Sequence, residues 1–211
     1  MSLLENNQSD VERVFNIEKR GTLIFEEKDL PLTPANWQQL EKLVSQSYFE
    51  HIIGGDANES HSVWVSRYFN DIDEPKALNQ IARDIEQIVM SPEMRHFYAQ
   101  FTGTDKLCLR RCQANKMRSG DFIGMHKDQD SSPDYYATVV FHLDCDYEGG
   151  AFETCDNRRY RPQRHMALVN NCSISHQVAK VESGKRITLA CFLSKSFGRS
   201  QAKRYDFKIE N

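Results

Sequence analysis

The second half of the chain is a series of short apolar and β-branched runs with no helical pattern between them. After Gly103 these runs are KLCLRRCQANKM, FIGMHKD, YYATVVFHLD, GAFETC, HMALVN, SISHQVAKV and RITLACFLS, separated by turn-forming residues. Consecutive strands without intervening helices hydrogen-bond to one another and form barrels or sandwiches. The sequence therefore predicts a mainly β fold, either a barrel or a jelly roll.

Helices are predicted ahead of these strands. TPANWQQLEKLVSQSYF opens with Thr33 as N-cap and Pro34 at the first helical position. In EPKALNQIARDIEQIVM the apolar residues recur at spacings of three and four from Leu78 to Val89, which marks an amphipathic helix. SPEMRHFYAQF begins a further helix with Ser91 as its cap. We expect these helices to cover one face of the sheet, giving an α+β chain.

The length of the chain predicts a single domain. Its 211 residues can bury a substantial core and lie near the usual upper range for one compact domain. We expect one domain over residues 1–211, with a helical part at 1–104 and a jelly-roll core at 105–197. The six cysteines lack the paired Cys-x-x-Cys spacing of zinc sites, so we expect them to be reduced and mostly buried.

Charge and hydropathy narrow the classes of function. A net charge of -3 and a pI of about 6.2 argue against a basic nucleic-acid groove and favour a small-molecule or peptide substrate. No run approaches the roughly 20 apolar residues of a membrane helix, and the first residues lack the apolar core of a signal peptide. We expect a cytoplasmic protein without membrane contact.

The stretch SGDFIGMHKDQD contains the first candidates for metal binding, His126 and Asp128. Residues i and i+2 of a strand point to the same face, so this imidazole and this carboxylate can meet at one ion. The pattern alone is weak, because His142 begins a second His-x-Asp. A site with two histidines and one carboxylate also needs a histidine from another strand, and His176 is the candidate. Arg186, ten residues later, can bind a carboxylate with two parallel hydrogen bonds.

These residues lie within a longer pattern. The segment H-x-V-x-x-V-x-x-G-x-R, from His176 to Arg186, resembles the distal half of the prolyl-4-hydroxylase-like iron(II)/2-oxoglutarate oxygenases. The proximal half also matches, with Gly120 six residues before His126, and TVVFHLDCDYEGGAF is similar to the central strand and Gly-Gly turn of that family. The resemblance covers roughly residues 105–196 and favours His126 over His142 as the metal ligand.

The resemblance implies a double-stranded β-helix braced by the N-terminal helices, with Fe(II) bound by His126, Asp128 and His176. It also implies 2-oxoglutarate as cosubstrate, bound through its far carboxylate by Arg186, and O2 as oxidant. Thr188, on the same strand face as Arg186, can add a hydroxyl to that carboxylate. The chain departs from the family at Met117, where many members have a tyrosine. Because Asp128 supplies a carboxylate ligand, the resemblance implies hydroxylation rather than halogenation.

Six further residues near the motif or in adjoining segments are candidate substrate contacts. Each also has a simpler explanation, which is a surface position or core packing. They are Trp64, Arg67, Asn115, Asp130, Tyr136 and Glu153.

Three functions remain open from the sequence. The first is a hydroxylase of an amino-acid-like small molecule or of a peptidyl residue. The second is oxidative demethylation of nucleic acid, because N-x-M-x-x-G-D-x-I-x-x-H-x-D resembles the proximal motif of AlkB-type enzymes. Phe192 stands where that family has a second arginine, which argues against this reading. The third is a jelly-roll module that binds a ligand without catalysis.

Overall fold

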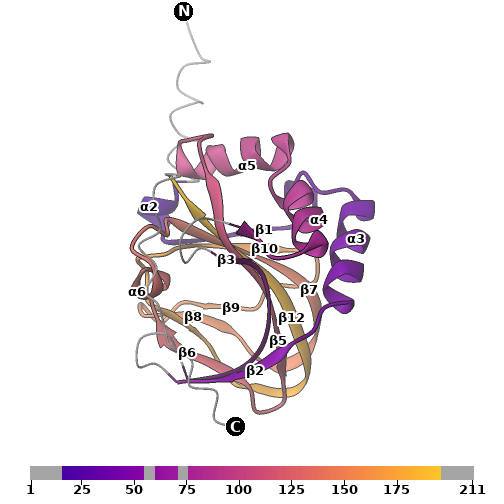
Figure 1. The fold of residues 1–211 in the computed structure, drawn as a ribbon. Coiled ribbons are helices and arrows are strands. Elements are labelled where there is room, and N and C mark those ends of the chain that lie inside the picture. The colour runs from indigo at the N-terminus through magenta and orange to yellow at the C-terminus, as the bar shows by residue number, and fades with distance from the viewer. Residues whose placement is uncertain (1–15, 55–59, 71–75, 196–211) are drawn as a thin grey trace, which may run out of the picture.

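One curled antiparallel sheet dominates the computed structural model, which describes residues 16–54, 60–70 and 76–195 (Figure 1). The strands follow the order β1-β10-β7-β12-β5-β3-β6-β11-β8-β9, and β2 and β4 pair with β3. Their bounds are β1 Thr22–Phe25, β2 Glu50–Ile53, β3 His61–Asn70, β4 Lys76–Ala77, β5 Cys108–Arg118, β6 Phe122–His126, β7 Ala137–Gly149, β8 Phe152–Thr154, β9 Arg159–Tyr160, β10 Ala167–Asn171, β11 His176–Val178 and β12 Val181–Ser194. This arrangement is the predicted double-stranded β-helix, so the fold class is confirmed.

The helices cover the outer face of the larger part of this sheet (Figure 1). They are α2 Ile17–Arg20, α3 Pro34–Ser45, α4 Gln80–Val89 and α5 Pro92–Thr102, with a 3-10 turn at Glu27–Asp29. The short helix α6, Asp128–Ser131, lies apart from them, just after β6. The predicted caps are confirmed, because the side chains of Thr33 and Ser91 accept backbone N–H groups at the starts of α3 and α5. None of the helices in the described part of the chain has the length and apolar character needed to span a membrane.

The predicted helix over Leu78 begins later than expected. The Asn79 side chain accepts the N–H of Ala82 and caps α4, so the helix starts at Gln80. Leu78 lies before the helix and is 48% exposed, while Ile85 and Val89 are buried. Leu78 fits the apolar spacing although it precedes the helix, and the Asn79 cap determines where the helix begins.

The boundary at residue 104 does not separate helices from sheet. β1 pairs with β10, and β3 lies between β5 and β6, so the N-terminal part contributes strands to the barrel. These strands are formed by residues of the runs GTLIFEE and VWVSRYF. The single domain over residues 1–211 stays a prediction, since both termini lie outside the described residues.

Gly184 is inside a strand rather than at the expected turn. β12 runs through it, and its φ of 78° lies in the left-handed region that favours glycine. A Cβ atom here would lie 2.1 Å from the carbonyl oxygen of Asp146 on β7. Glycine therefore allows β12 to bend past β7 just before Arg186.

Candidate metal centre

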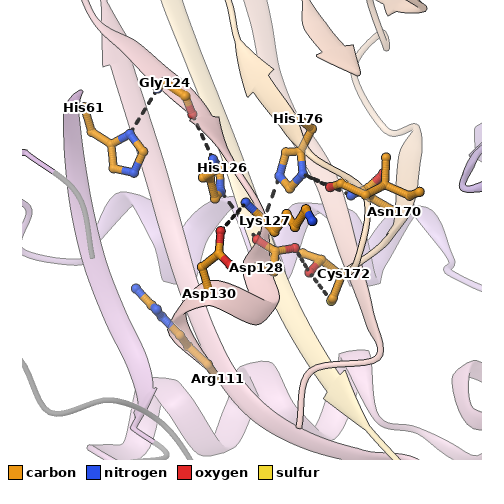
Figure 2. Close-up of polar contacts among 12 residues, drawn as sticks. His61, Arg111, Gly124, His126, Lys127, Asp128, Asp130, Asn170, Cys172 and His176 are labelled. Carbon is orange, nitrogen blue, oxygen red and sulfur yellow. Dashed lines mark hydrogen bonds and ion pairs between the residues drawn. The ribbon is translucent and has the colours of Figure 1, made fainter. Parts of the chain in front are cut away.

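Three side chains meet where the end of strand β6 lies beside the start of strand β11 (Figure 2). His126 is the last residue of β6, His176 is the first of β11, and the two are direct partners across the strand pair. Asp128 opens α6. Its Oδ1 lies 3.5 Å from Nε2 of His126 and 3.8 Å from Nε2 of His176. One ligand atom from each residue lies within 4.8 Å of the others, which is a spacing that a single metal ion can bridge.

The chain brings Asp128 to this point by a turn and not by the expected strand. β6 ends at His126, Lys127 is extended, and Asp128 begins a short helix. The Asp130 carboxylate accepts the backbone N–H of Lys127 at 3.3 Å and stabilises this turn. The expectation that His126 and Asp128 share one strand face was therefore wrong, although the two side chains do meet.

Main-chain carbonyls set the protonation of both histidines. Nδ1 of His126 lies 2.9 Å from the carbonyl oxygen of Gly124, and Nδ1 of His176 lies 2.9 Å from that of Ile174. A carbonyl oxygen can only accept, so these contacts favour a proton on each Nδ1, although the Asn170 amide nitrogen, a donor, also lies 3.1 Å from Nδ1 of His176. Each Nε2 then presents its lone pair toward Asp128, which is the form in which a histidine binds a metal.

The Asp128 carboxylate is buried and ionised. Thr138 Oγ1, on β7, donates a hydrogen bond to Asp128 Oδ2 at 2.5 Å. Burial alone raises the pKa of Asp128, but His176, His126 and the Thr138 hydroxyl outweigh burial and keep this pKa well below its usual range. Burial also lowers the pKa of His176. A neutral imidazole beside an ionised carboxylate is the state required for metal binding.

The three residues face a cavity inside the barrel that also contains Arg186. The Arg186 side chain is 2% exposed, with Nη1 3.5 Å from Thr188 Oγ1 and 3.7 Å from Met117 Sδ. Its Nε has no hydrogen-bond partner among the described residues. A buried guanidinium without an anion is costly, so this end of the cavity is suited to a carboxylate ligand. Met117, at the position where many members of the resembled family have a tyrosine, contacts the guanidinium through its sulfur.

The residues present thus fit both groups that the sequence resemblance implied. Two neutral imidazole nitrogens and one carboxylate form a ligand set suited to Fe(II), and three protein ligands leave positions for other molecules. Arg186 and Thr188 are placed to hold the far carboxylate of 2-oxoglutarate in the same cavity.

Two of the six predicted substrate residues line this cavity. Asn115 on β5 is 8% exposed and accepts a hydrogen bond from Gln113 at 2.9 Å. Arg67 on β3 is half-buried and lies opposite Gln113 in the strand register. The structure brings both residues to the same wall of the cavity.

The other four candidates are not among the residues that line this cavity, and their role in substrate binding stays a prediction. Asp130 is exposed and caps the α6 turn, and the Tyr136 hydroxyl donates to Glu18 on the outer surface. The alternation of β3 that turns Val63, Val65 and Arg67 inward turns Trp64 outward, where it stacks on His51. Glu153 pairs with Arg159 at 3.3 Å and accepts from Gln177, outside the cavity lining.

Two further histidines, His142 on β7 and His165 in the turn before β10, lie apart from the metal cluster. His142 is buried, with its pKa lowered by burial and by the nearby Arg186 charge. His165 stacks on Trp37 and pairs with Glu27 and Glu41. Neither belongs to the group of potential metal ligands in the described residues, which agrees with the choice of His126 over His142.

Several cavity residues were missed by sequence reasoning. They include His61, whose Nδ1 accepts the N–H of Gly124, together with Thr138 and the β5 residues Arg111 and Gln113. For Arg111 and Gln113 a signal existed, because alternate residues of a strand face the same side and Asn115 was already a candidate. Thr138 and His61 carried no such signal, since contacts between distant strands decide their positions.

Comparison with known proteins agrees with this geometry. Residues 112–194, which contain all three metal-ligand candidates and Arg186, match the model of the 2OG-Fe(II) oxygenase superfamily. This region belongs to the 2OG-Fe(II) oxygenase superfamily. The oxygenases of this superfamily use Fe(II), 2-oxoglutarate and O2, and the chain supplies a residue set for the first two. The sequence resemblance to this superfamily is therefore confirmed.

Solved structures extend the likeness over most of the described chain. A 2OG-Fe(II) oxygenase family oxidoreductase from Burkholderia pseudomallei is 25% identical, with a TM-score of 0.82 over 92% of this chain and 94% of that one. A prolyl-4-hydroxylase from Pseudomonas putida is 14% identical, with a TM-score of 0.59 over 88% of this chain and 99% of that one. HygX from Streptomyces hygroscopicus, solved with nickel and 2-oxoglutarate, is 9% identical, with a TM-score of 0.60 over 86% and 85% of the two chains. The last two show the shared fold alone. No protein with a curated description matches the sequence.

Proposed function

We propose that this protein hydroxylates an unactivated carbon of an amino-acid-like small molecule or of a peptidyl residue. The observation that carries the proposal is the placement of the His126, Asp128 and His176 cluster and of the buried Arg186 on one cavity. When bound together, Fe(II) and 2-oxoglutarate use O2 to insert one oxygen atom into a C–H bond and release succinate and carbon dioxide. Because a carboxylate is the third protein ligand, hydroxylation is favoured over halogenation.

The protein's own groups bind, orient and exclude water. Arg186, with Thr188 beside it, neutralises and orients the far carboxylate of the cosubstrate. Thr138 fixes the Asp128 carboxylate, and the two backbone carbonyls fix the imidazole rings. Apolar side chains from several strands line the rest of the cavity and keep it dry. They are Val63, Val65, Ile123, Val140, Phe152 and Val178.

An anaerobic titration tests the first half of the proposal. Adding Fe(II) and 2-oxoglutarate should produce a visible metal-to-ligand charge-transfer band in the wild type. His126→Ala should abolish this band, and Arg186→Gln should demand a much higher 2-oxoglutarate concentration. His165→Ala is the matched control, because His165 lies outside the cavity and should leave the band unchanged. A folded, iron-binding protein that gives no band would contradict the proposed cofactor pair.

Product analysis separates the remaining functions. A hydroxylase releases succinate in a manner stimulated by small molecules or peptides, and its substrate gains one oxygen atom. A nucleic-acid demethylase releases formaldehyde from methylated bases and binds in a salt-sensitive way. A binding module without catalysis releases neither product, and its ligand affinity survives His126→Ala. Formaldehyde from methylated nucleic acid, or no product with any substrate class, would refute hydroxylation.

A further inference from the structure

A buried histidine that does not belong to the metal cluster lies on the inner side of the sheet. His142 is on β7, and its side chain is fully buried. Thr138 and Val140, at spacings of two along the same strand, both line the cavity. Side chains two residues apart in a strand point to the same face. The His142 side chain therefore points to the cavity side of β7 and not to the helices.

The pairing of β7 with β12 supports this direction. His142 pairs with Thr188, and the next pair on this face is Val140 with Ala190. Thr188 and Ala190 both line the cavity, and the register of the two strands is regular from Thr188 to Leu193. Residues that pair directly across two strands lie on the same face of the sheet. His142 and Thr188 therefore face the same interior.

His142 is also near the buried guanidinium of Arg186. Thr188, its partner on β12, has its Oγ1 3.5 Å from Nη1 of Arg186. Burial lowers the pKa of His142 well below its usual value, and the charge of Arg186 lowers it further. The imidazole is therefore neutral and carries one N–H group and one lone pair. We call Arg186, Thr188 and His142 the cosubstrate end of the cavity.

Two nitrogen atoms of the cosubstrate end are buried without a hydrogen-bond partner among the described residues. They are Nε2 of His142 and Nε of Arg186. Buried polar atoms in native proteins are nearly always hydrogen-bonded, because leaving one unpaired costs its full desolvation free energy. The two atoms come from neighbouring strands, and both residues lie next to Thr188. This placement indicates one shared partner that comes from outside the chain.

A carboxylate has the chemistry that this partner needs. Its two oxygens only accept, so they can receive hydrogen bonds from the guanidinium, from a hydroxyl and from an imidazole N–H at the same time. The other ring nitrogen of His142, Nδ1, lies 4.0 Å from Cys145 Sγ, which is a long contact to a weak acceptor. Hydrogen bonds to an ionised group are about twice as strong as neutral ones. A bound carboxylate therefore favours the tautomer that has its proton on Nε2.

We propose that His142 is a third residue that binds the far carboxylate of 2-oxoglutarate, to which its Nε2–H donates a hydrogen bond beside Arg186. Sequence reasoning assigned this task to Arg186 and Thr188 alone. The inference rests on the proposed function and deepens it, because it makes His142 a residue that selects a cosubstrate with a carboxylate at its far end.

Two matched 2-oxo acids test the proposed contact. 2-Oxoglutarate and 2-oxopentanoate share the group that chelates the metal and the length of the carbon chain, but 2-oxopentanoate ends in a methyl group. Each is titrated anaerobically into protein loaded with Fe(II), and the charge-transfer band reports the half-saturating concentration. His142→Leu should raise this concentration for 2-oxoglutarate at least about tenfold, because it removes a hydrogen bond to a charged group. The value for 2-oxopentanoate should not change, whereas general damage to the cavity would raise both values.

Further variants separate the hydrogen bond from the shape of the side chain. His142→Gln keeps an N–H donor near the position of Nε2 and should recover most of the lost 2-oxoglutarate affinity. His142→Phe keeps a ring without a donor, so it should behave like His142→Leu and replaces that variant if leucine prevents folding. His165→Leu is the matched control, because His165 stacks on Trp37 outside the cavity and should bind both acids as the wild type does. Fe(II) affinity without cosubstrate should stay the same in all four variants.

The outcomes distinguish this inference from the proposed function. An equal loss of affinity for the two acids, an unchanged 2-oxoglutarate affinity in the leucine and phenylalanine variants, or a glutamine variant no better than these two would overturn the role of His142. Each of these results would leave the proposed function in place. A wild-type protein that binds Fe(II) and gives no band with 2-oxoglutarate would contradict the proposed function, and the role of His142 with it.

Discussion

The two faces of strands β5, β7 and β12 are built from opposite kinds of residue. The face toward the helices carries apolar side chains that are almost wholly buried: Cys112, Ala114, Val139, Phe141, Leu189, Cys191 and Leu193. The face toward the cavity carries polar and charged side chains: Arg111, Gln113, Asn115, Thr138, Arg186 and Thr188. The first face is stabilised by apolar packing, whereas the second carries hydrogen-bonding groups that can bind other molecules.

This difference teaches that burial alone does not identify what a residue contributes. Apolar burial stabilises the fold by removing hydrocarbon from water. A buried cation without an anion does not contribute to the free energy of folding. It contributes to the free energy of binding when an anionic ligand pairs with it. Substitutions on the two faces should therefore affect different measurements, and the following four tests run from the largest expected effect to the smallest.

The first test removes a large side chain from the helix face. Phe141 is fully buried and makes an edge contact with Trp37, with ring centroids 6.0 Å apart. Phe141→Ala should lower the free energy of unfolding by about 3–5 kcal/mol, because it leaves a cavity in the core. Denaturant unfolding measures this loss. The Fe(II) and 2-oxoglutarate affinities of the folded variant should stay the same. A fall in these two affinities would show that the helix face also determines ligand binding.

The second test neutralises the buried cation of the cavity face. Arg186→Gln should weaken 2-oxoglutarate binding by about 2–5 kcal/mol, the usual cost of removing one partner of a buried charged pair. The free energy of unfolding without ligands should not fall, because Arg186 Nε lacks a hydrogen-bond partner among the described residues. Calorimetric titration and denaturant unfolding give the two values. A large loss of stability would show that Arg186 holds the fold together in the way Phe141 does.

The third test removes one hydroxyl from the cavity face. Thr138→Val keeps the shape of the side chain but removes the donor to Asp128 Oδ2. Fe(II) affinity should fall about 10- to 100-fold, the usual effect of losing a group that orients a metal ligand. Metal titration measures this change, with Thr154→Val as a control threonine on β8. Unchanged metal affinity would mean that the carboxylate needs no orienting partner.

The fourth test uses His142, a buried polar residue at the end of the cavity face. Burial, together with the Arg186 charge, lowers the pKa of His142 well below its usual value, so the folded protein keeps this residue neutral. The unfolded chain takes up the proton below a pH of about 6.5, so unfolding becomes easier as the pH falls.

His142→Leu should remove that contribution to the pH dependence. Between pH 7.5 and 5.5 the metal-free wild type should lose about 1 kcal/mol more stability than the variant, given about 1.4 kcal/mol per pKa unit. Denaturant unfolding at the two pH values measures the difference. Identical pH dependence in both proteins would show that His142 titrates alike in the folded and unfolded states.

Sequence reasoning succeeded where a local pattern decides the outcome. Strand runs, the caps at Thr33 and Ser91 and the ordered spacing from His126 to Arg186 are all readable from neighbouring residues. The structure places the three metal-ligand candidates within 4.8 Å, and Arg186 faces the same cavity.

It failed where distant segments decide. Nothing near Tyr136 in the sequence showed that its hydroxyl reaches Glu18, more than a hundred residues away. Thr138 was overlooked because its position beside Asp128 depends on where β7 lies in the sheet, which the sequence near Thr138 does not show. Once a strand is known, the alternation of its side chains tells which residues share a face. Which residues of other strands lie beside them depends on how the strands pair.

The backbone carbonyls of Gly124 and Ile174 have a consequence for how this site can vary. Each stands two residues before a ligand histidine and receives its Nδ1 proton. Many metal sites give this task to a side chain, which a single substitution can remove. Here a main-chain carbonyl, which every amino acid provides, contacts each histidine, and at His176 the Asn170 side chain adds a contact at 3.1 Å. The pocket can therefore exchange the side chains around its histidines, and with them its choice of substrate, while the two imidazoles stay ready to receive a metal.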